Sequence, residues 1–346
     1  MTTDYPSKGQ RNAFRGLRKD EGTTFSASCE AVPFQSNCKA DSGVVSNMDW
    51  KTSRIDALLE QALVEDRAVS DSTTNLTIDA NMRASAAIIA RQELVVSGLG
   101  AVERIFDIFA RLDTRPPAHT RFEVVSHPEI FDGVRVRSGQ VLAVVRHNAR
   151  ALLSCERVIL NLMQHLSGIA TLTRTYVDAI QGTHAKVLDT RKTVPGLRIL
   201  EKYAVQCGGG TNHRIDLASG ILIKNNHISL GGGLTAVLKR ALEQRKRGQR
   251  VQVEVRTAQE LEEAIANGAE AILLDNMTVK EVKHSVERIK KATEGQTERW
   301  IPVEASGGIV LENIRAYAET GVDFISVGAL THSAKAADIS MSIAAE

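Results

Sequence analysis

The most informative segment of the chain is residues 185–214, which read AKVLDTRKTVPGLRILEKYAVQCGGGTNHR. The apolar run at 186–188 predicts a short buried strand, and the polar sequence Asp-Thr-Arg-Lys follows it directly at 189–192. Further on, three consecutive glycines lead into His213 and Arg214. Consecutive glycines allow the backbone to approach a ligand closely, so the segment indicates a binding site at a strand end.

Side chains that can carry a positive charge are concentrated in and just after this segment. They are Arg191, Lys192, His213, Arg214 and Lys224. Like charges gathered in one place repel one another unless an anion sits among them. Arginine offers a planar fork for a carboxylate, and histidine is a donor whose charge adjusts near neutral pH. The group therefore predicts a clamp for a dicarboxylate.

Short β-rich runs alternate with helical patterns from residue 184 onward. The predicted strands are 186–189, 221–224, 251–255, 271–275, 301–305 and 323–327, and the helices lie near 197–207, 233–247, 257–267, 278–292 and 310–320. Such alternation predicts parallel strands joined by crossover helices. Polar or glycine residues end every strand, and strand ends converge in a barrel whereas they spread into a line in an open sheet. We therefore predict an α/β fold with a (β/α) barrel of about six strands over residues 184–330.

The preceding half of the chain predicts a smaller α+β sandwich domain over residues 48–183. It has helical spacing at 50–65 and 98–109, strand patterns at 84–91, 93–96 and 122–145, and a long helix whose apolar stripe runs from Cys155 to Ile180. Arg157 falls off that stripe and is free to face solvent or another subunit. We expect residues 331–346 to pack back on this domain, and residues 1–47, which lack an apolar period, to be a disordered extension.

Composition excludes several classes of protein. The formal net charge is +2 and aromatic residues make up 4% of the chain, which disfavours a nucleic-acid partner. The 4 cysteines have no zinc-ligand spacing, and this suits a reducing compartment. An apolar run long enough to span a membrane and an early signal sequence are both lacking, so the expected location is the cytoplasm.

Two glycine turns indicate a phosphate site beside the predicted anion clamp. Ser306, Gly307 and Gly308 stand between a strand and a helix, where backbone N–H groups can hold a phosphate, and Gly328 ends the next strand. Glu254 and Asp275 end neighbouring strands, and paired carboxylates near a phosphate favour Mg²⁺, bound directly or through water, or sugar hydroxyls. The residues thus predict an anionic small molecule beside a phosphorylated sugar.

Several motifs in this order resemble the quinolinate phosphoribosyltransferases, also called nicotinate-nucleotide pyrophosphorylases (carboxylating). They are ERVILNLMQHLSGIAT, DTRKTVPGLR, KYAV, GGGTNHR, IKNNH, VEVRT, LLDN, EASGGI and VGALTHS. The likeness covers roughly residues 50–343. It implies conversion of quinolinate and phosphoribosyl pyrophosphate into nicotinate mononucleotide, pyrophosphate and carbon dioxide, in NAD synthesis.

The resemblance also implies a role for each matching residue. The pyridine dicarboxylate would be held by Arg157 from a neighbouring subunit together with Thr190, Arg191, His213, Arg214 and Lys224 of the barrel. Phosphoribosyl pyrophosphate would be held by Lys192, Glu254, Asp275, Ser306, Gly307, Gly308 and Gly328. Lys192, Glu254 and Asp275 would be catalytic, with Mg²⁺ as cofactor at the two carboxylates. A shared site implies a homodimer, with a hexamer as an alternative.

The sequence departs from the family pattern in the turn after Glu65-Asp66, which lacks a usual glycine, and at Asn225, where aspartate is frequent. Two other functions remain open at this point. One is a related phosphoribosyltransferase for another pyridine or pyrimidine carboxylate, such as nicotinate. The other is a catalytically silent nucleotide sensor. The number of cations disfavours a monocarboxylate substrate, and the presence of Lys192, Glu254 and Asp275 disfavours a sensor.

Overall fold

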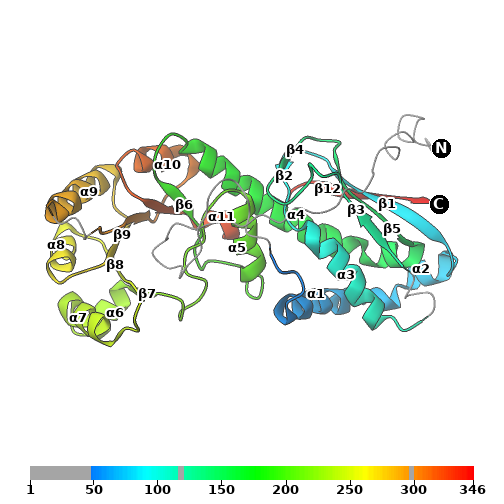
Figure 1. The fold of residues 1–346 in the computed structure, drawn as a ribbon, viewed down its shortest axis with the longest axis horizontal. Helices are drawn as coiled ribbons and strands as arrows, with labels where there is room; N and C mark the ends of the chain where they lie inside the picture. The colour runs from blue at the N-terminus through cyan, green and yellow to red at the C-terminus, as the bar shows by residue number, and fades with distance from the viewer. Residues whose placement is uncertain (1–47, 116–120, 296–299) are drawn as a thin grey trace.

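A computed structural model describes residues 48–115, 121–295 and 300–346 of the chain. The molecule is elongated, with a parallel α/β half at one end and an antiparallel α+β half at the other (Figure 1). The long helix α4, Ala149–Ala179, runs between the two halves. The predicted disorder of residues 1–47 concerns a segment that lies outside the described residues.

The parallel half is built on a six-stranded sheet with the order β6-β11-β10-β9-β8-β7. The strands are β6 Lys186–Leu188, β7 Ile221–Ile223, β8 Val251–Val255, β9 Ala271–Asp275, β10 Val303–Ser306 and β11 Phe324–Ser326. β6, the first of these strands in sequence, pairs with β11, the last of them, so the order is that of a barrel opened between β6 and β7. β6 and β7 end the order, and Thr211 forms a parallel bridge with Leu188 at the free edge of β6.

Helices follow the strands of this sheet (Figure 1). They are α5 Arg198–Cys207, α6 Asn225–Leu230, α7 Leu234–Gln244, α8 Ala258–Ala266, α9 Val279–Thr293, α10 Leu311–Ala318 and α11 Ala329–His332. Among them, α7, α8, α9 and α10 bury apolar side chains such as Leu238, Leu261, Val282 and Ile314. β8 is buried at all of its positions, including the polar Gln252 and Glu254. All six strands are parallel where they pair, so their carboxyl ends meet at one edge of the sheet.

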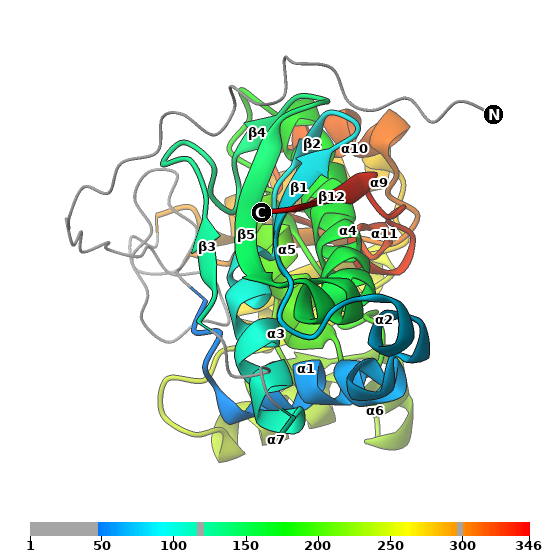
Figure 2. The ribbon, with the colours of Figure 1, turned by 90° about the vertical axis from the view of Figure 1, so that its right-hand side faces the viewer.

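The antiparallel half has a four-stranded sheet with the order β12-β1-β5-β3 (Figure 2). These strands are β1 Arg83–Ala90, β3 Glu123–Val125, β5 Val141–Asn148 and β12 Ile339–Ala345, and the short pair beside them is β2 Leu94–Val95 with β4 Arg135–Val136. The helices are α1 Ser53–Glu65, the 3₁₀ turn η2 Ala68–Ser70, α2 Ser72–Thr77 and α3 Leu99–Leu112. The C-terminal strand β12 thus pairs with β1, far from it in sequence.

Close packing joins the two halves along α4. A Cβ on Gly168 would lie 2.1 Å from the carbonyl oxygen of Lys335, so the segment before β12 crosses α4 where only glycine fits. On α5, the Tyr203 hydroxyl donates to Asp132 Oδ2 at 2.7 Å, and its ring meets Trp50 edge to face with centroids 5.7 Å apart. The predicted apolar stripe of α4 is buried at Cys155, Leu166 and most other positions.

The six parallel strands confirm the predicted fold class, and the helices between them lie where the pattern places them. The segment after Glu65-Asp66, which the sequence indicates to be a turn, also contains η2 and α2, and the Asp71 side chain caps α2 by accepting from Thr74 N. Three further short elements, α6, α11 and β12, were not predicted. Among the described residues, none of the helices is long and apolar enough to cross a membrane.

Candidate active site

The end of β6 is organised by a buried ion pair. Asp189 has no exposed surface, and its carboxylate accepts from Lys202 Nζ on α5 and from His213 N, the latter at 2.8 Å. Lys202, 1% exposed, also donates to the carbonyl oxygen of His213 at 3.0 Å. Burial raises the pKa of Asp189 to about 6, against the opposing charge of Lys202, and burial lowers the pKa of Lys202. The pair joins the β6 end to the segment that carries His213.

A second buried acid, Glu304 on β10, holds the ring of His213. The ring Nε2 lies 3.4 Å from Glu304 Oε2, while Nδ1 accepts from the backbone N–H of Arg214 at 2.8 Å. Gln252 Nε2 donates to Glu304 at 2.7 Å, and the Ser326 hydroxyl donates to its other oxygen. Burial acts to raise the pKa of Glu304, but the charge and hydrogen bond of His213 and the other donors outweigh it, so the pKa is lowered.

Arg191 and Arg214 lie close enough for their charges to interact. Burial first, and the charge of Arg191 second, lower the pKa of Arg214, which donates through a guanidinium nitrogen to the carbonyl oxygen of Gly220 at 3.0 Å. Arg191 Nε is buried and has no hydrogen-bond partner among the residues that the structure describes. A buried donor without a partner is costly, and an anion placed here would remove that cost.

The ends of β7, β8 and β9 carry a chain of opposite charges. Lys224 Nζ lies 3.3 Å from Glu254 Oε2, and Arg256 bridges Glu254 at 3.3 Å and Asp275 at 3.0 Å. Glu254 is buried, whereas the side chains of Lys224 and Arg256 are 47% and 45% exposed. Gln252 lies two residues before Glu254 on β8, hence on the same face, so this chain and the Glu304 network share the inner side of the sheet.

The glycine turns lie beside these charges. Gly307 has φ +92°, and a Cβ there would lie 2.3 Å from Asn276 Oδ1, so a larger residue cannot be accommodated. A Cβ on Gly328 would lie 3.0 Å from Cδ of Lys192 and 3.1 Å from Nε2 of His332. Lys192 therefore reaches across from the β6 end to the β11 end, next to the Ser306 turn.

The contacts above link most of the strand-end residues, and among the described residues none of these contacts includes the Arg157 side chain. Arg157 is exposed on α4, and makes no hydrogen bond or ion pair within the described parts of the chain. Thr190 contributes a local contact, since its Oγ1 accepts from Lys192 N at 3.1 Å.

Sequence reasoning missed several residues that organise the site. Gln252 interrupts an apolar strand, and that signal was available in the sequence; Glu304 was among the polar residues predicted at strand ends, but its contact with His213 was not. Lys202 and Glu201 sit within an ordinary amphipathic pattern, so their complete burial could not be foreseen. Arg256 belongs to the motif VEVRT, but the sequence did not predict that it would pair with both Glu254 and Asp275.

Comparison with known proteins decides the family. The model of the quinolinate phosphoribosyl transferase N-terminal domain matches residues 71–167, and that of the C-terminal domain matches residues 169–342. The chain belongs to the quinolinate phosphoribosyltransferase family. Curated members of this family include the probable nicotinate-nucleotide pyrophosphorylase [carboxylating] of Bacillus subtilis (strain 168), 41% identical over 286 residues, covering 83% of this chain and 92% of the relative. The corresponding enzyme of Mycobacterium leprae (strain TN) is 40% identical over 288 residues, covering 82% and 95%.

A solved structure of the family has the same architecture. The crystal structure of NadC from Streptococcus pyogenes matches with a TM-score of 0.78 at 35% identity, covering 87% of this chain and 100% of that one. The family is one of pentosyltransferases, so phosphoribosyl transfer is the activity class of the chain, consistent with a place in NAD biosynthesis.

The carboxylates of Glu254 and Asp275 are the candidate ligands for Mg²⁺ at the strand ends. Within the described residues, no group of three or more His, Cys, Asp or Glu side chains could by itself enclose a metal ion. Mg²⁺ in phosphate-transfer sites is typically held by one or two carboxylates plus substrate phosphates and waters. Glu254 and Asp275 both contact Arg256, so they lie within reach of one cation and would supply two oxygen ligands to a partly coordinated Mg²⁺, in competition with that guanidinium.

Proposed function

We propose that this chain transfers the phosphoribosyl group of phosphoribosyl pyrophosphate to the ring nitrogen of quinolinate, releasing pyrophosphate and carbon dioxide and forming nicotinate mononucleotide. The observation that carries this proposal is the position of Arg191. Its buried Nε has no partner among the described residues, and the like charge of Arg214 lies nearby. A substrate carboxylate between them would satisfy the donor and relieve the repulsion.

The residues divide into two sets around the proposed reaction. Arg191, His213, Arg214 and Lys224, with Thr190, would face quinolinate, although the ring of His213 is held by Glu304 and Arg214 N and so acts mainly in positioning. Lys192, the Ser306-Gly307-Gly308 turn and Gly328 would hold the phosphates. Glu254 and Asp275 would hold ribose hydroxyls and Mg²⁺, which would neutralise charge on the leaving pyrophosphate.

The proposed chemistry needs charge placed in advance and little proton transfer by the protein. The pyridine nitrogen attacks the anomeric carbon of ribose, and the bond from that carbon to pyrophosphate breaks. The ring carboxylate next to the nitrogen then leaves as carbon dioxide, and the electron pair left on the ring carbon takes up a proton. Fixed cations beside the ring stabilise that electron pair, which is electrostatic catalysis.

We also propose that the site is completed by Arg157 of a second copy in a homodimer. The Arg157 side chain is exposed and has no hydrogen bond or ion pair among the described residues. Apolar side chains are exposed at Val194 after β6, at Leu217 before β7 and at Leu230, the last residue of α6, and a covering subunit would bury them. Assembly as a hexamer remains compatible with this arrangement, and a cytoplasmic location is part of the proposal.

Product stoichiometry tests the proposal. With quinolinate, phosphoribosyl pyrophosphate and Mg²⁺, the protein should release pyrophosphate and carbon dioxide in a 1:1 ratio. Pyrophosphate release with nicotinate instead would favour the monocarboxylate alternative, and binding of the nucleotide without turnover would favour a sensor.

The shared site has its own test. Arg157→Ala should lose turnover while keeping its thermal midpoint, because no core contact is removed. Mixing it with Arg191→Ala should restore part of the activity, since one site in a mixed dimer keeps both arginines. Normal turnover by Arg157→Ala alone would refute the shared site.

A further inference from the structure

Two neighbouring buried charges on α5 hold opposite ends of the loop that carries Arg191 and Lys192. This substrate loop, residues 189–194, follows β6. At its start, Asp189 pairs with Lys202. At its end, the backbone N–H of Val194 donates to Glu201 Oε2 at 3.2 Å. Glu201 has no exposed surface, and Lys202 is 1% exposed.

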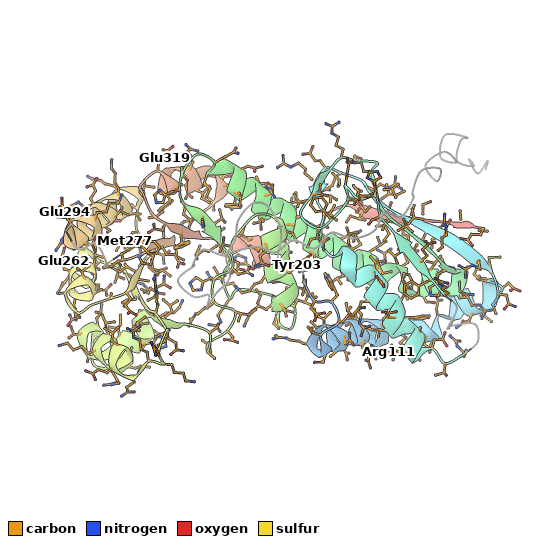
Figure 3. The ribbon with its side chains drawn as sticks, in the orientation of Figure 1. Arg111, Tyr203, Glu262, Met277, Glu294 and Glu319 are labelled. Atoms are coloured by element: carbon orange, nitrogen blue, oxygen red, sulfur yellow. The ribbon has the colours of Figure 1, made fainter. Side chains whose placement is uncertain are left out.

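Glu201 also connects the loop to α4. Its other oxygen, Oε1, lies 2.8 Å from Nε2 of His165. His165 stands about two helical turns after Arg157, so the carboxylate joins the loop to the helix from which Arg157 projects. Figure 3 labels Tyr203, the residue after Lys202, in the middle of the molecule where α5 packs on α4.

Burying two charged side chains costs desolvation free energy, which is recovered only where each charge has several hydrogen-bond or ionic partners. Because apolar side chains at such positions are often no less stable, buried charges need another reason to be present. Each charge here has two partners, and in each case at least one belongs to the substrate loop or to the segment of His213. Between these anchors the Lys192 side chain is exposed, and the loop has two further contacts: Thr331 Oγ1 donates to the Lys192 carbonyl oxygen at 2.7 Å, and Arg198 Nε donates to Thr193 Oγ1 at 3.0 Å. The two charges therefore tie both ends of the loop to α5, in addition to their contribution to stability.

We infer that Glu201 and Lys202 are positioning residues for the two substrates of the proposed reaction, one for each end of the loop. Lys202 holds Asp189 and the carbonyl group of His213 in place. It thereby positions the neighbouring Arg191 and Arg214 to bind quinolinate. Glu201 holds the backbone N–H of Val194 in place, and thereby positions Lys192 to bind phosphoribosyl pyrophosphate. The inference rests on the proposed function, because it assigns each end of the loop to one of its substrates.

The test is a comparison of KM values for the two substrates in Glu201→Gln and Lys202→Arg. Both variants keep the shape or the charge of the original side chain, so the fold should persist. Glu201→Gln should raise KM for phosphoribosyl pyrophosphate about 10-fold with KM for quinolinate changed less than about 2-fold, and Lys202→Arg should show the reverse. A purely structural role would move both KM values together.

A matched control and a second readout complete the experiment. Glu319→Gln changes an exposed carboxylate at the C-cap of α10, paired with Arg315, and should leave both KM values unchanged. Amide hydrogen exchange of Val194 should accelerate in Glu201→Gln and not in the control. Equal changes of both KM values in each variant, or unchanged exchange at Val194, would overturn the inference. A wild-type protein inactive with both substrates would instead overturn the proposed function, and this inference with it.

Discussion

Charges at the strand ends fall into two clusters that differ in burial. The inner cluster, Asp189, Lys202, His213 and Glu304, is at most 8% exposed, and its members hold one another. The outer cluster is Lys224, Glu254, Arg256 and Asp275, in which both cations are nearly half exposed. If a charge of the inner cluster loses its partner, water cannot solvate it, whereas water can solvate an unpaired charge of the outer cluster. The inner cluster should therefore govern stability and geometry, and the outer cluster should govern binding and turnover.

The largest expected effect is on stability, from Lys202→Met. Removal of the ammonium leaves Asp189 buried without its counter-charge, and such losses cost about 3–5 kcal/mol. Urea denaturation followed by circular dichroism measures this cost. Adding Asp189→Asn to Lys202→Met should recover part of it, because the uncompensated charge is then gone. A loss below about 1 kcal/mol in the single variant would contradict the division into two clusters.

In the outer cluster, Lys224→Met should affect turnover and leave stability nearly unchanged. The half-exposed ammonium contributes little to folding, so the free energy of unfolding should change by less than about 1 kcal/mol. Loss of one fixed cation beside the reacting ring should lower kcat/KM for quinolinate by about 100-fold. Steady-state kinetics and thermal denaturation of the same preparation check both halves of the prediction. A large fall in stability with normal kinetics would place Lys224 with the inner cluster.

The difference in free energy of unfolding between wild type and Glu304→Gln should depend on pH, as expected for a charge of the inner cluster. The folded pKa of Glu304 is lowered, so its contribution to stability is present above the ordinary glutamate value of 4.5 and is lost as pH falls through the folded pKa. The variant should be less stable than wild type at pH 7, by about 1–3 kcal/mol, and the difference should shrink below pH 4.5. Denaturation curves at several pH values measure it. A pH-independent difference would mean that the charge of Glu304 is not what stabilises the fold.

Gly328→Ala should give the smallest effect. The new methyl would meet the flexible ends of Lys192 and His332 at 3.0 Å and 3.1 Å, and both can move slightly. KM for phosphoribosyl pyrophosphate should rise about 2- to 5-fold, with stability unchanged. Gly307→Ala is the informative partner, because its methyl would meet Asn276 at 2.3 Å with φ at +92°. Equal effects of the two substitutions would argue against a close phosphate turn at Gly307.

The sequence predicted those features that follow from periodicity and from single strong signals. Alternating β-rich and helical runs predicted the six parallel strands, and the polar residues after them predicted which edge carries the site. The α2 helix was missed because its polar sequence, Ser72–Thr77, has no apolar period and depends on the Asp71 cap. The partners of Lys202 and Glu304 were missed because they are set by strand order and burial, which a local pattern does not contain.

The most direct test of the account is the preference for quinolinate over nicotinate in wild type and Arg191→Met. Arg191 Nε is a buried donor that lacks a partner among the described residues, and the account supplies that partner as the second carboxylate of the substrate. The wild-type kcat/KM should favour quinolinate by at least about 100-fold, and Arg191→Met should lose most of that preference. Comparable turnover of both acids by wild type, or an undiminished preference in the variant, would contradict the account.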